Sequence, residues 1–227
     1  MPVSETRGAL FQSGNLRIKI CGITNPEDAG MAARAGADAI GINLFPGSKR
    51  FVEIADVCDW LREMPVTRVA VVVNASADLL ARVQEAGVFD AVQFHGDETP
   101  EQCDALGRAA RLPWLRAVRV GPSTQPSDLV ESALHYSKAR GLLFDTLVPD
   151  YGGSGKVFDW SLIPAELAHR AVLSGGLSAQ NVGDAIRQLR PFAVDVSSGI
   201  EVEGAKGVKD HARMAAFVRA VREADAR

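Results

Sequence analysis

Short apolar runs alternate with amphipathic segments along the chain from residue 16 onwards. The runs are rich in Val, Ile, Leu and Ala, and there are eight of them, at 16–21, 38–44, 68–73, 90–95, 114–120, 141–146, 171–175 and 192–197. Most are continuously apolar rather than alternating, as is typical of parallel strands that are covered on both faces. The pattern therefore predicts eight buried strands separated by helices.

Start and stop signals mark the intervening segments as helices. Asn25 followed by Pro26 predicts a helix start, with an N-cap side chain and a proline at the first helical position. Similar start signals recur at Ser76, Thr99 and Ser178. Glycines stand where two of these helices should end, at Gly36 and Gly87.

Strict alternation of strand and helix predicts a parallel sheet with right-handed crossovers, either open and doubly wound or closed into a barrel. Eight units favour the closed form, an α/β fold of the (β/α)8 TIM barrel type. Gly22 alone follows the first strand, where a dinucleotide-binding site has three glycines. We expect a single barrel domain over 16–227 and a loosely ordered N-terminal extension over 1–15.

Composition narrows the class of partner. A net charge of -3 and 6% aromatic residues leave no electrostatic footprint for nucleic acid or an anionic membrane, so a small molecule is the expected partner. Three widely spaced cysteines suit a reducing compartment, and we expect a cytoplasmic protein. No apolar run approaches the ~20 residues of a membrane span. The four histidines are scattered without metal-ligand spacing, so no metal is expected.

In a barrel of this kind, chemistry belongs on the loops that follow the strands. Two glycine-rich turns follow the seventh and eighth strands, one with Gly175 and Gly176, the other with Ser198 and Gly199. Glycine allows several backbone N–H groups to approach an anion closely. Ordinary strand-to-helix turns are the alternative, but paired glycine turns on consecutive units favour a phosphate site.

Several side chains at other strand ends have two interpretations each. Asp145 follows an apolar strand and fits either a general acid or a structural carboxylate. Cys21 fits either a core residue or a reactive thiolate that faces the barrel mouth. Asp195 is expected to brace the glycine turn beside it, and His95 to be a satisfied histidine rather than a catalyst.

Two loops add further candidates. Arg50 lies in the loop after the second strand, where it could be solvated or could bind a substrate carboxylate with its planar fork. The segment 149–157 follows the strand that bears Asp145 and is rich in glycine. It fits a mobile lid over the site or a plain flexible loop.

Taken in order, the motifs resemble a known family. They are KICGIT (19–24), GINLFPGSKRFV (41–52), VQFHGDE (92–98), LFDT (143–146), GGSGKVFDW (152–160), LSGGL (173–177) and VDVSSGIE (194–201). Their order and spacing resemble phosphoribosylanthranilate isomerase of tryptophan biosynthesis, from about residue 17 to the C-terminal segment. Each motif alone is unspecific, but the ordered set is specific.

The resemblance implies an Amadori rearrangement of N-(5-phosphoribosyl)anthranilate without a cofactor. It assigns Asp145 as the general acid, which protonates the ribose ring oxygen, and Cys21 as the general base, which removes the C2′ proton. Arg50 would hold the anthranilate carboxylate. The phosphate would be bound by Gly175, Gly176, Ser198 and Gly199. His95 and Asp195 would support these groups, in a monomer or a homodimer.

Two alternatives remain from the sequence. One is another phosphosugar barrel enzyme, such as indole-glycerol-phosphate synthase, which uses a lysine inside the barrel. Lys19 shares the side of its strand with Cys21 but lies deeper. The other is a phosphosugar-binding barrel that has lost catalysis. The joint presence of Cys21, Asp145 and Arg50 favours an enzyme over it.

Overall fold

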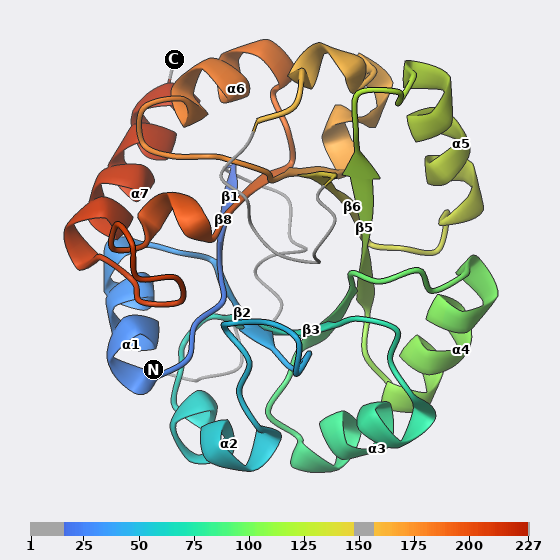
Figure 1. Cartoon of the computed structure of the whole chain (residues 1–227), viewed down its shortest axis with the longest axis vertical. Coiled ribbons are helices and arrows are strands. Elements are labelled where there is room, and N and C mark those ends of the chain that lie inside the picture. Colours follow the sequence, from blue (N-terminus) through green and yellow to red (C-terminus); the bar gives the residue numbers. More distant parts are fainter. Residues whose placement is uncertain (1–15, 148–156, 227) are drawn as a thin grey trace.

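A computed structural model describes residues 16–147 and 157–226. Eight parallel strands close into a barrel in chain order, β1 to β8 (Figure 1). They are β1 Arg17–Cys21, β2 Ala39–Asn43, β3 Thr67–Val72, β4 Ala91–Phe94, β5 Trp114–Val120, β6 Gly141–Thr146, β7 Ala171–Leu173 and β8 Ala193–Val196. Each predicted apolar run coincides with one of these strands to within two residues at either end, so the predicted TIM barrel is confirmed.

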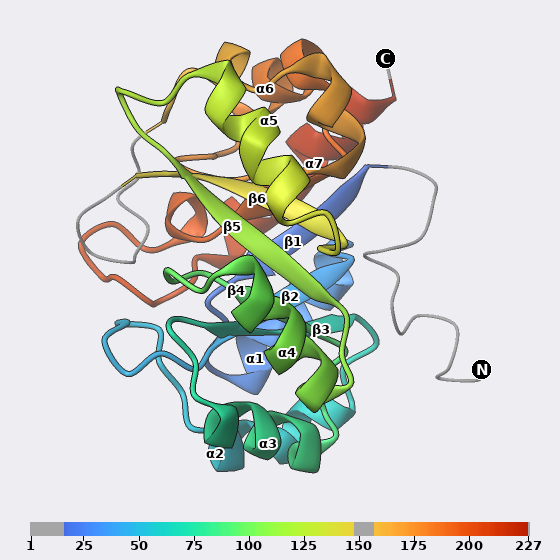
Figure 2. The same ribbon diagram turned by 90° about the vertical axis from the view of Figure 1, so that its right-hand side faces the viewer.

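Helices form an outer ring around the strands, and Figure 2 shows α4 and α5 beside β5. The α-helices are α1 Pro26–Ala35, α2 Ile54–Arg62, α3 Ala77–Ala86, α4 Pro100–Ala110, α5 Pro126–His135, α6 Val182–Leu189 and α7 His211–Asp225. Among the residues described between β6 and β7, only two 3-10 segments occur, η2 Trp160–Leu162 and η3 Ala165–Arg170. The predicted strict alternation is wrong there. Pro164, which has no N–H, separates the two short segments.

Most of the predicted helix signals act as expected. Asn25, Ser76 and Thr99 each cap a helix by accepting the backbone N–H three residues later. Gly36 and Gly87 end helices in the left-handed conformation, with φ values of 101° and 62°. The prediction for Ser178 is wrong, because α6 begins later, at Val182, with Asn181 in the N-cap position. Asn181 instead accepts the Ser178 N–H at 2.8 Å, which tightens the turn before the helix.

The strands are apolar throughout because both of their faces are covered. Inside the barrel, small and branched side chains fill the axis, among them Ala39, Val69, Leu143 and Val172. The opposite faces pack against the helices in a larger core. This rigid scaffold leaves the polar side chains at the carboxyl ends of the strands. No helix within 16–147 and 157–226 is long and apolar enough to span a membrane.

Candidate active site

A cavity opens at the carboxyl ends of the strands, where the fold predicts chemistry. Most of the predicted site residues line it together: Cys21, Arg50, His95, Asp145, Gly175, Gly176, Asp195 and Ser198. Gly199 lines the adjoining hollow, which it shares with Gly176 and Ser198. Residues that are far apart in sequence thus form one concave, polar surface.

One side of this cavity, here called the base wall after the general base expected at Cys21, is built by β1, β8 and the loops that follow β2 and β8. Cys21 ends β1 and pairs in register with Gly41 of β2. A Cβ on Gly41 would lie 2.8 Å from the Cys21 sulfur, so only glycine leaves the thiol its present space. Gly22, with a φ of 75°, then turns the chain beneath the Arg50 side chain.

Lys19 lies beneath Cys21 on the base wall and is fully buried. Its Nζ donates to Asp195 Oδ1 at 2.8 Å, between residues that are paired in register on β1 and β8. Asp195 Oδ2 also accepts the Ser174 hydroxyl at 3.2 Å. Asp195 therefore joins the ends of β1, β7 and β8, whereas the sequence predicted only that it braces the adjacent glycine turn.

Burial and charge act in opposite directions on the thiol. Although Cys21 keeps some surface towards the cavity, burial raises its pKa, and the charge of Lys19 opposes this rise. Burial by itself would lower the pKa of Lys19, but the charges of Asp195 and Cys21 outweigh it, so the Lys19 pKa is raised. The ammonium is thus the charged form at neutral pH.

Arg50 is held in place by a carboxylate. Its Nε and Nη2 donate to the two oxygens of Glu201 at 2.6 and 3.0 Å, in a buried bidentate pair. Lys209 Nζ lies 3.2 Å from Glu201 Oε1 and donates to the Ser197 carbonyl at 3.0 Å. Burial would raise the pKa of Glu201, but its bonds to Arg50 and the charge of Lys209 lower it. Glu201 therefore couples Arg50 to the turn after β8.

The two glycine turns after β7 and β8 have backbone conformations and contacts that only glycine accommodates. Gly175 and Gly176 have φ values of 78° and 65°, which side-chain-bearing residues rarely adopt. A Cβ on Gly199 would lie 1.9 Å from the Leu177 carbonyl oxygen, so the two turns are in direct contact. Ser198 begins a short 3-10 segment, Ser198–Ile200, that continues this turn. Both turns face the same end of the cavity.

The other side of the cavity, here called the acid wall after the general acid expected at Asp145, is formed by the ends of β4 and β6. Asp145 Oδ1 accepts the Thr146 N–H at 2.8 Å, and its Oδ2 lies 3.4 Å from His95 Nε2. The Gln93 amide Nε2 lies 2.8 Å from His95 Nδ1. With this amide donating, the imidazole carries its hydrogen on Nε2, towards the carboxylate. His95 is thus oriented towards Asp145.

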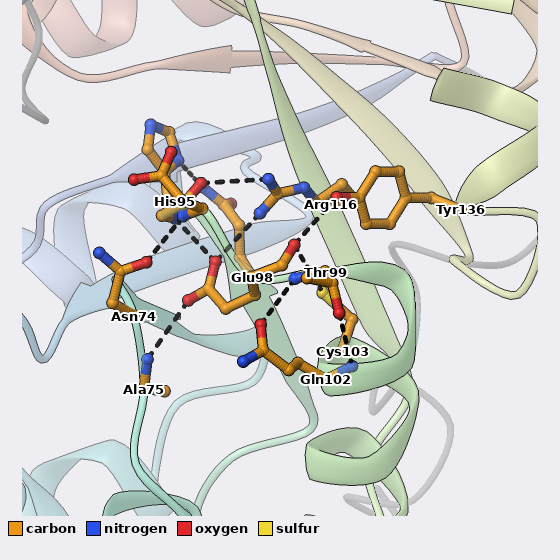
Figure 3. A network of polar contacts seen from close by, with 12 residues as sticks. Asn74, Ala75, His95, Glu98, Thr99, Gln102, Cys103, Arg116 and Tyr136 are labelled. Atoms are coloured by element: carbon orange, nitrogen blue, oxygen red, sulfur yellow. Dashed lines mark hydrogen bonds and ion pairs between the residues drawn. The ribbon is translucent and has the colours of Figure 1, made fainter. Parts of the chain in front are cut away.

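A buried ion pair supports the loop that follows His95 (Figure 3). Arg116 donates to Glu98 Oε2 at 3.0 Å and to the Gly96 carbonyl at 3.1 Å. Glu98 Oε2 also accepts the Gly96 N–H at 2.9 Å. The Tyr136 ring lies against the Arg116 guanidinium, 4.8 Å from its centroid to Cζ. Both polar groups of Gly96 are therefore fixed, and with them the exit of β4.

Sequence reasoning did not assign roles to several residues that shape the site. They are Lys19, Gln93, Glu98, Arg116, Glu201 and Lys209. Lys19 and Gln93 each stand two positions before a candidate residue on the same strand, a spacing that places side chains on one face. This spacing of two could have identified Lys19 and Gln93 from the sequence, whereas no local spacing indicates the long-range partners of Glu201.

Three predictions are not tested by the described residues. The proposed lid lies outside them except for Val157, and so does the extension 1–15. The limits of the domain therefore stay a prediction. Within 16–147 and 157–226, no three His, Cys, Asp or Glu side chains are placed to hold a metal ion together.

The sequence matches a protein-family model over most of its length. The model for N-(5'phosphoribosyl)anthranilate (PRA) isomerase matches residues 18–220. The chain is 54% identical over 221 residues to the N-(5'-phosphoribosyl)anthranilate isomerase of Ralstonia nicotianae, covering 92% of this chain and 94% of the relative. It is 51% identical over 220 residues to that of Leptothrix cholodnii, covering 96% of each.

Solved structures give the same result. The crystal structure of phosphoribosyl anthranilate isomerase from Thermotoga maritima superimposes with a TM-score of 0.80 at 42% identity, over 92% of this chain and 99% of that one. Another isomerase structure, in complex with reduced 1-(o-carboxyphenylamino)-1-deoxyribulose 5-phosphate, matches with a TM-score of 0.77 at 39% identity, over the same shares of the two chains.

Proposed function

Because the chain belongs to the N-(5'-phosphoribosyl)anthranilate isomerase family, we propose that Asp145 and Cys21 perform the acid and base steps of its reaction. The protein is an isomerase of tryptophan biosynthesis that converts N-(5-phosphoribosyl)anthranilate to 1-(2-carboxyphenylamino)-1-deoxyribulose 5-phosphate. The observation that carries the proposal is that both residues line one cavity, from strands β1 and β6.

The two ends of the substrate match the two kinds of anchor in the cavity. A phosphate fits the backbone of Gly175, Gly176, Ser198 and Gly199, where glycine permits close approach. The aromatic carboxylate fits Arg50, because Glu201 binds one edge of the guanidinium and leaves the rest for a second anion. The complex of a related isomerase with an analogue carrying both groups supports this pairing. The ribose then lies between the acid wall and the base wall.

In the first step, Asp145 gives its proton to the ribose ring oxygen. The bond between that oxygen and C1′ breaks, and the nitrogen lone pair forms a Schiff base with C1′. His95 Nε2, 3.4 Å from the carboxylate, supports the anion that Asp145 becomes, and Gln93 keeps the imidazole in this orientation. This gives His95 a supporting function rather than a catalytic one.

In the second step, the Cys21 thiolate takes the proton from C2′. The C2′–H electron pair forms the C1′=C2′ bond, and the pair of the C1′=N bond returns to nitrogen, which gives an enolamine. Protonation of this enolamine at C1′ and loss of the hydroxyl proton at C2′ yield the ketone product. Asp195 contributes by fixing the strand ends on which the thiol stands.

Turnover of freshly made N-(5-phosphoribosyl)anthranilate, followed by the loss of anthranilate fluorescence, tests the assignment. We expect Cys21→Ala and Asp145→Ala each to lower kcat by about 10²- to 10⁴-fold, the usual contribution of a general acid or base. Cys58→Ala, in helix α2, and Asp184→Ala, in helix α6, are the matched controls and should keep full activity. If either site variant stays fully active, its assigned step is wrong, and an inert wild type would indicate a barrel without catalysis.

The remaining predictions about partners stand as proposals. Binding of a small phosphoribosyl compound is supported by the ligand of the related isomerase. The isomerase of Thermotoga maritima is dimeric, and for this chain a monomer or a homodimer is proposed. A cytoplasmic location likewise remains a proposal.

A further inference from the structure

Lys19 is a buried charge to which the acid and base steps assign no function. Its side chain is fully buried near the centre of the barrel, two positions before Cys21 on the same face of β1. A lone ammonium in such a place is strongly unfavourable unless anions compensate it. The partners of Lys19 therefore indicate what this residue does.

Two groups lie against the ammonium. Asp195 Oδ1 accepts from Nζ at 2.8 Å, and Ser174 holds the other oxygen of this carboxylate. The second group is the Cys21 sulfur. A Cβ on Gly41 would lie 3.1 Å from Lys19 Nζ and 2.8 Å from Cys21 Sγ, so both atoms border the same gap in front of this glycine.

Other charges face the thiol from each element packed around it. Asp195 on β8 disfavours a thiolate, while Lys209, ahead of α7, and Arg50, after β2, favour one. Glu201 binds both of these cations, which compensates much of their charge. After burial, Lys19 has the largest influence on the Cys21 pKa, in the lowering direction, and it also hydrogen-bonds to the thiol.

We propose that Lys19 is a positioning residue for the base: its ammonium, anchored by Asp195, stabilises the Cys21 thiolate that receives the substrate proton. The proposal rests on the assignment of Cys21 as the base. The thiol first loses its proton to solvent, and the thiolate then takes the C2′ proton while the C–H electron pair enters the enolamine. Lys19 keeps its three protons throughout and changes only the stability of the anion.

The thiol titration can be measured without substrate, through the rate of alkylation by iodoacetamide as a function of pH. The full chain carrying Cys58→Ser serves as the background, and mass spectrometry of the peptide that contains Cys21 gives the rate. Since only the thiolate reacts, the midpoint of the pH dependence reports its formation. Lys19→Met and Lys19→Gln are compared in this background, the second keeping a hydrogen-bond donor for Asp195.

Arg68→Met is the matched control. Arg68 is also a buried cation paired with an aspartate, Asp90, at 2.8 Å, but its charge is not among those that shift the Cys21 pKa. We expect both Lys19 variants to move the alkylation midpoint upwards by at least about one pH unit, as loss of a close opposite charge does. Arg68→Met should leave the midpoint unchanged. An unchanged midpoint in the Lys19 variants overturns the proposal, as does an equal rise in Arg68→Met.

A second measurement does not depend on the stability of these variants. Coupling between two sites is reciprocal, so removing the thiolate must also affect the ammonium. The NMR resonance of Lys19 Cε should therefore titrate at lower pH in Cys21→Ala than in the wild type. Identical titrations would overturn the proposal.

The kinetic readout separates this inference from the assignment of the base. If Cys21→Ala is inactive but the alkylation midpoint is the same with and without Lys19, the assignment of Cys21 as the base is supported and the positioning function of Lys19 is wrong. If Cys21→Ala stays active while the midpoint moves with Lys19, the assigned base is wrong and the inference as stated falls with it, because no proton is transferred to Cys21. In the supporting case, Lys19→Met loses activity at neutral pH and regains it as the pH rises.

Discussion

The base wall and the acid wall face the same cavity but are built differently. On the base wall the charges are buried in close pairs, with 2.8 Å between Lys19 and Asp195 and 2.6 Å between Arg50 and Glu201. On the acid wall, His95 and Asp145 are 3.4 Å apart, and their side chains keep 16% and 20% of their exposure. One wall fixes its charges in the interior, whereas the other leaves its charge near solvent.

This difference fits the two tasks proposed for Cys21 and Asp145. A thiol in a buried position favours its neutral form, so a thiolate base needs fixed cations nearby. A carboxyl acid must release a proton and recover it in each cycle, which is easier beside solvent and an imidazole. The proposed base thus stands among fixed cations that favour its anion, whereas the proposed acid keeps contact with solvent and with an imidazole.

The largest effect is expected on the base wall, from removing Glu201. Glu201→Ala leaves Arg50 and Lys209 as buried cations without this carboxylate, so we expect a loss of about 3–5 kcal/mol in the free energy of unfolding. Asp145→Ala, on the acid wall, should lose less than about 1 kcal/mol because its partner is more distant and partly exposed. Urea denaturation measures both, and equal losses would remove the distinction between the walls.

The pH dependence of this stabilisation has a defined sign. The folded-state pKa of Glu201 is lowered below its ordinary value of 4.5, so its contribution to stability is complete above about pH 4.5. The contribution is lost as the pH falls through the lower, folded-state pKa. Acid titration followed by circular dichroism should show a weaker acid destabilisation in Glu201→Gln than in the wild type.

A second prediction concerns Cys103, a buried thiol in helix α4 behind the acid wall. Burial raises the pKa of Cys103 to about 12, against which the charge of Arg116 has a smaller, lowering effect. Relative to its ordinary value of 9.0, about 10³-fold less thiolate is present near neutral pH. Native Cys103 should therefore react with iodoacetamide about 10³-fold more slowly than in the unfolded chain. Rapid native alkylation of Cys103, read by mass spectrometry, would contradict this.

A third, smaller effect is expected on the acid wall itself. His95→Asn removes the ring nitrogen that faces Asp145, and we expect kcat to fall about tenfold, equivalent to about 1.4 kcal/mol. The free energy of unfolding should change little, because the pair is partly exposed. Gln93→Leu, which removes the amide at His95 Nδ1, should give a loss of the same kind but no larger. A drop as deep as that of Asp145→Ala would make His95 catalytic.

The smallest effect is expected far from both walls. Arg82 and Glu53 form an ion pair at 3.3 Å, with 57% and 54% of their side chains exposed. Arg82→Ala should change the free energy of unfolding by less than about 1 kcal/mol and leave kcat unchanged. It sets the baseline against which the Glu201 and His95 variants are measured.

Much of the scaffold could be read from the sequence because its signals are local. Continuous apolar runs predict buried parallel strands, and Asn25, Ser76 and Thr99 mark helix starts. The start expected at Ser178 failed because Asn181, three positions later, takes over the capping position. Among the described residues between β6 and β7, two 3-10 segments on either side of Pro164 stand where a helix was expected.

The same distinction between local and long-range signals applies to the candidate site. Local sequence was enough to predict which groups stand at the strand ends, including Cys21, Asp145, Arg50 and the glycine turns, because strand ends in a parallel barrel meet at one face. The partners of these groups, in contrast, are set by the folded chain. Glu201 reaches Arg50 across 151 residues, and Asp195 reaches Lys19 across 176. Such contacts depend on closure of the barrel, which places β8 beside β1, and no local pattern encodes the distance or burial that sets the charge of each group.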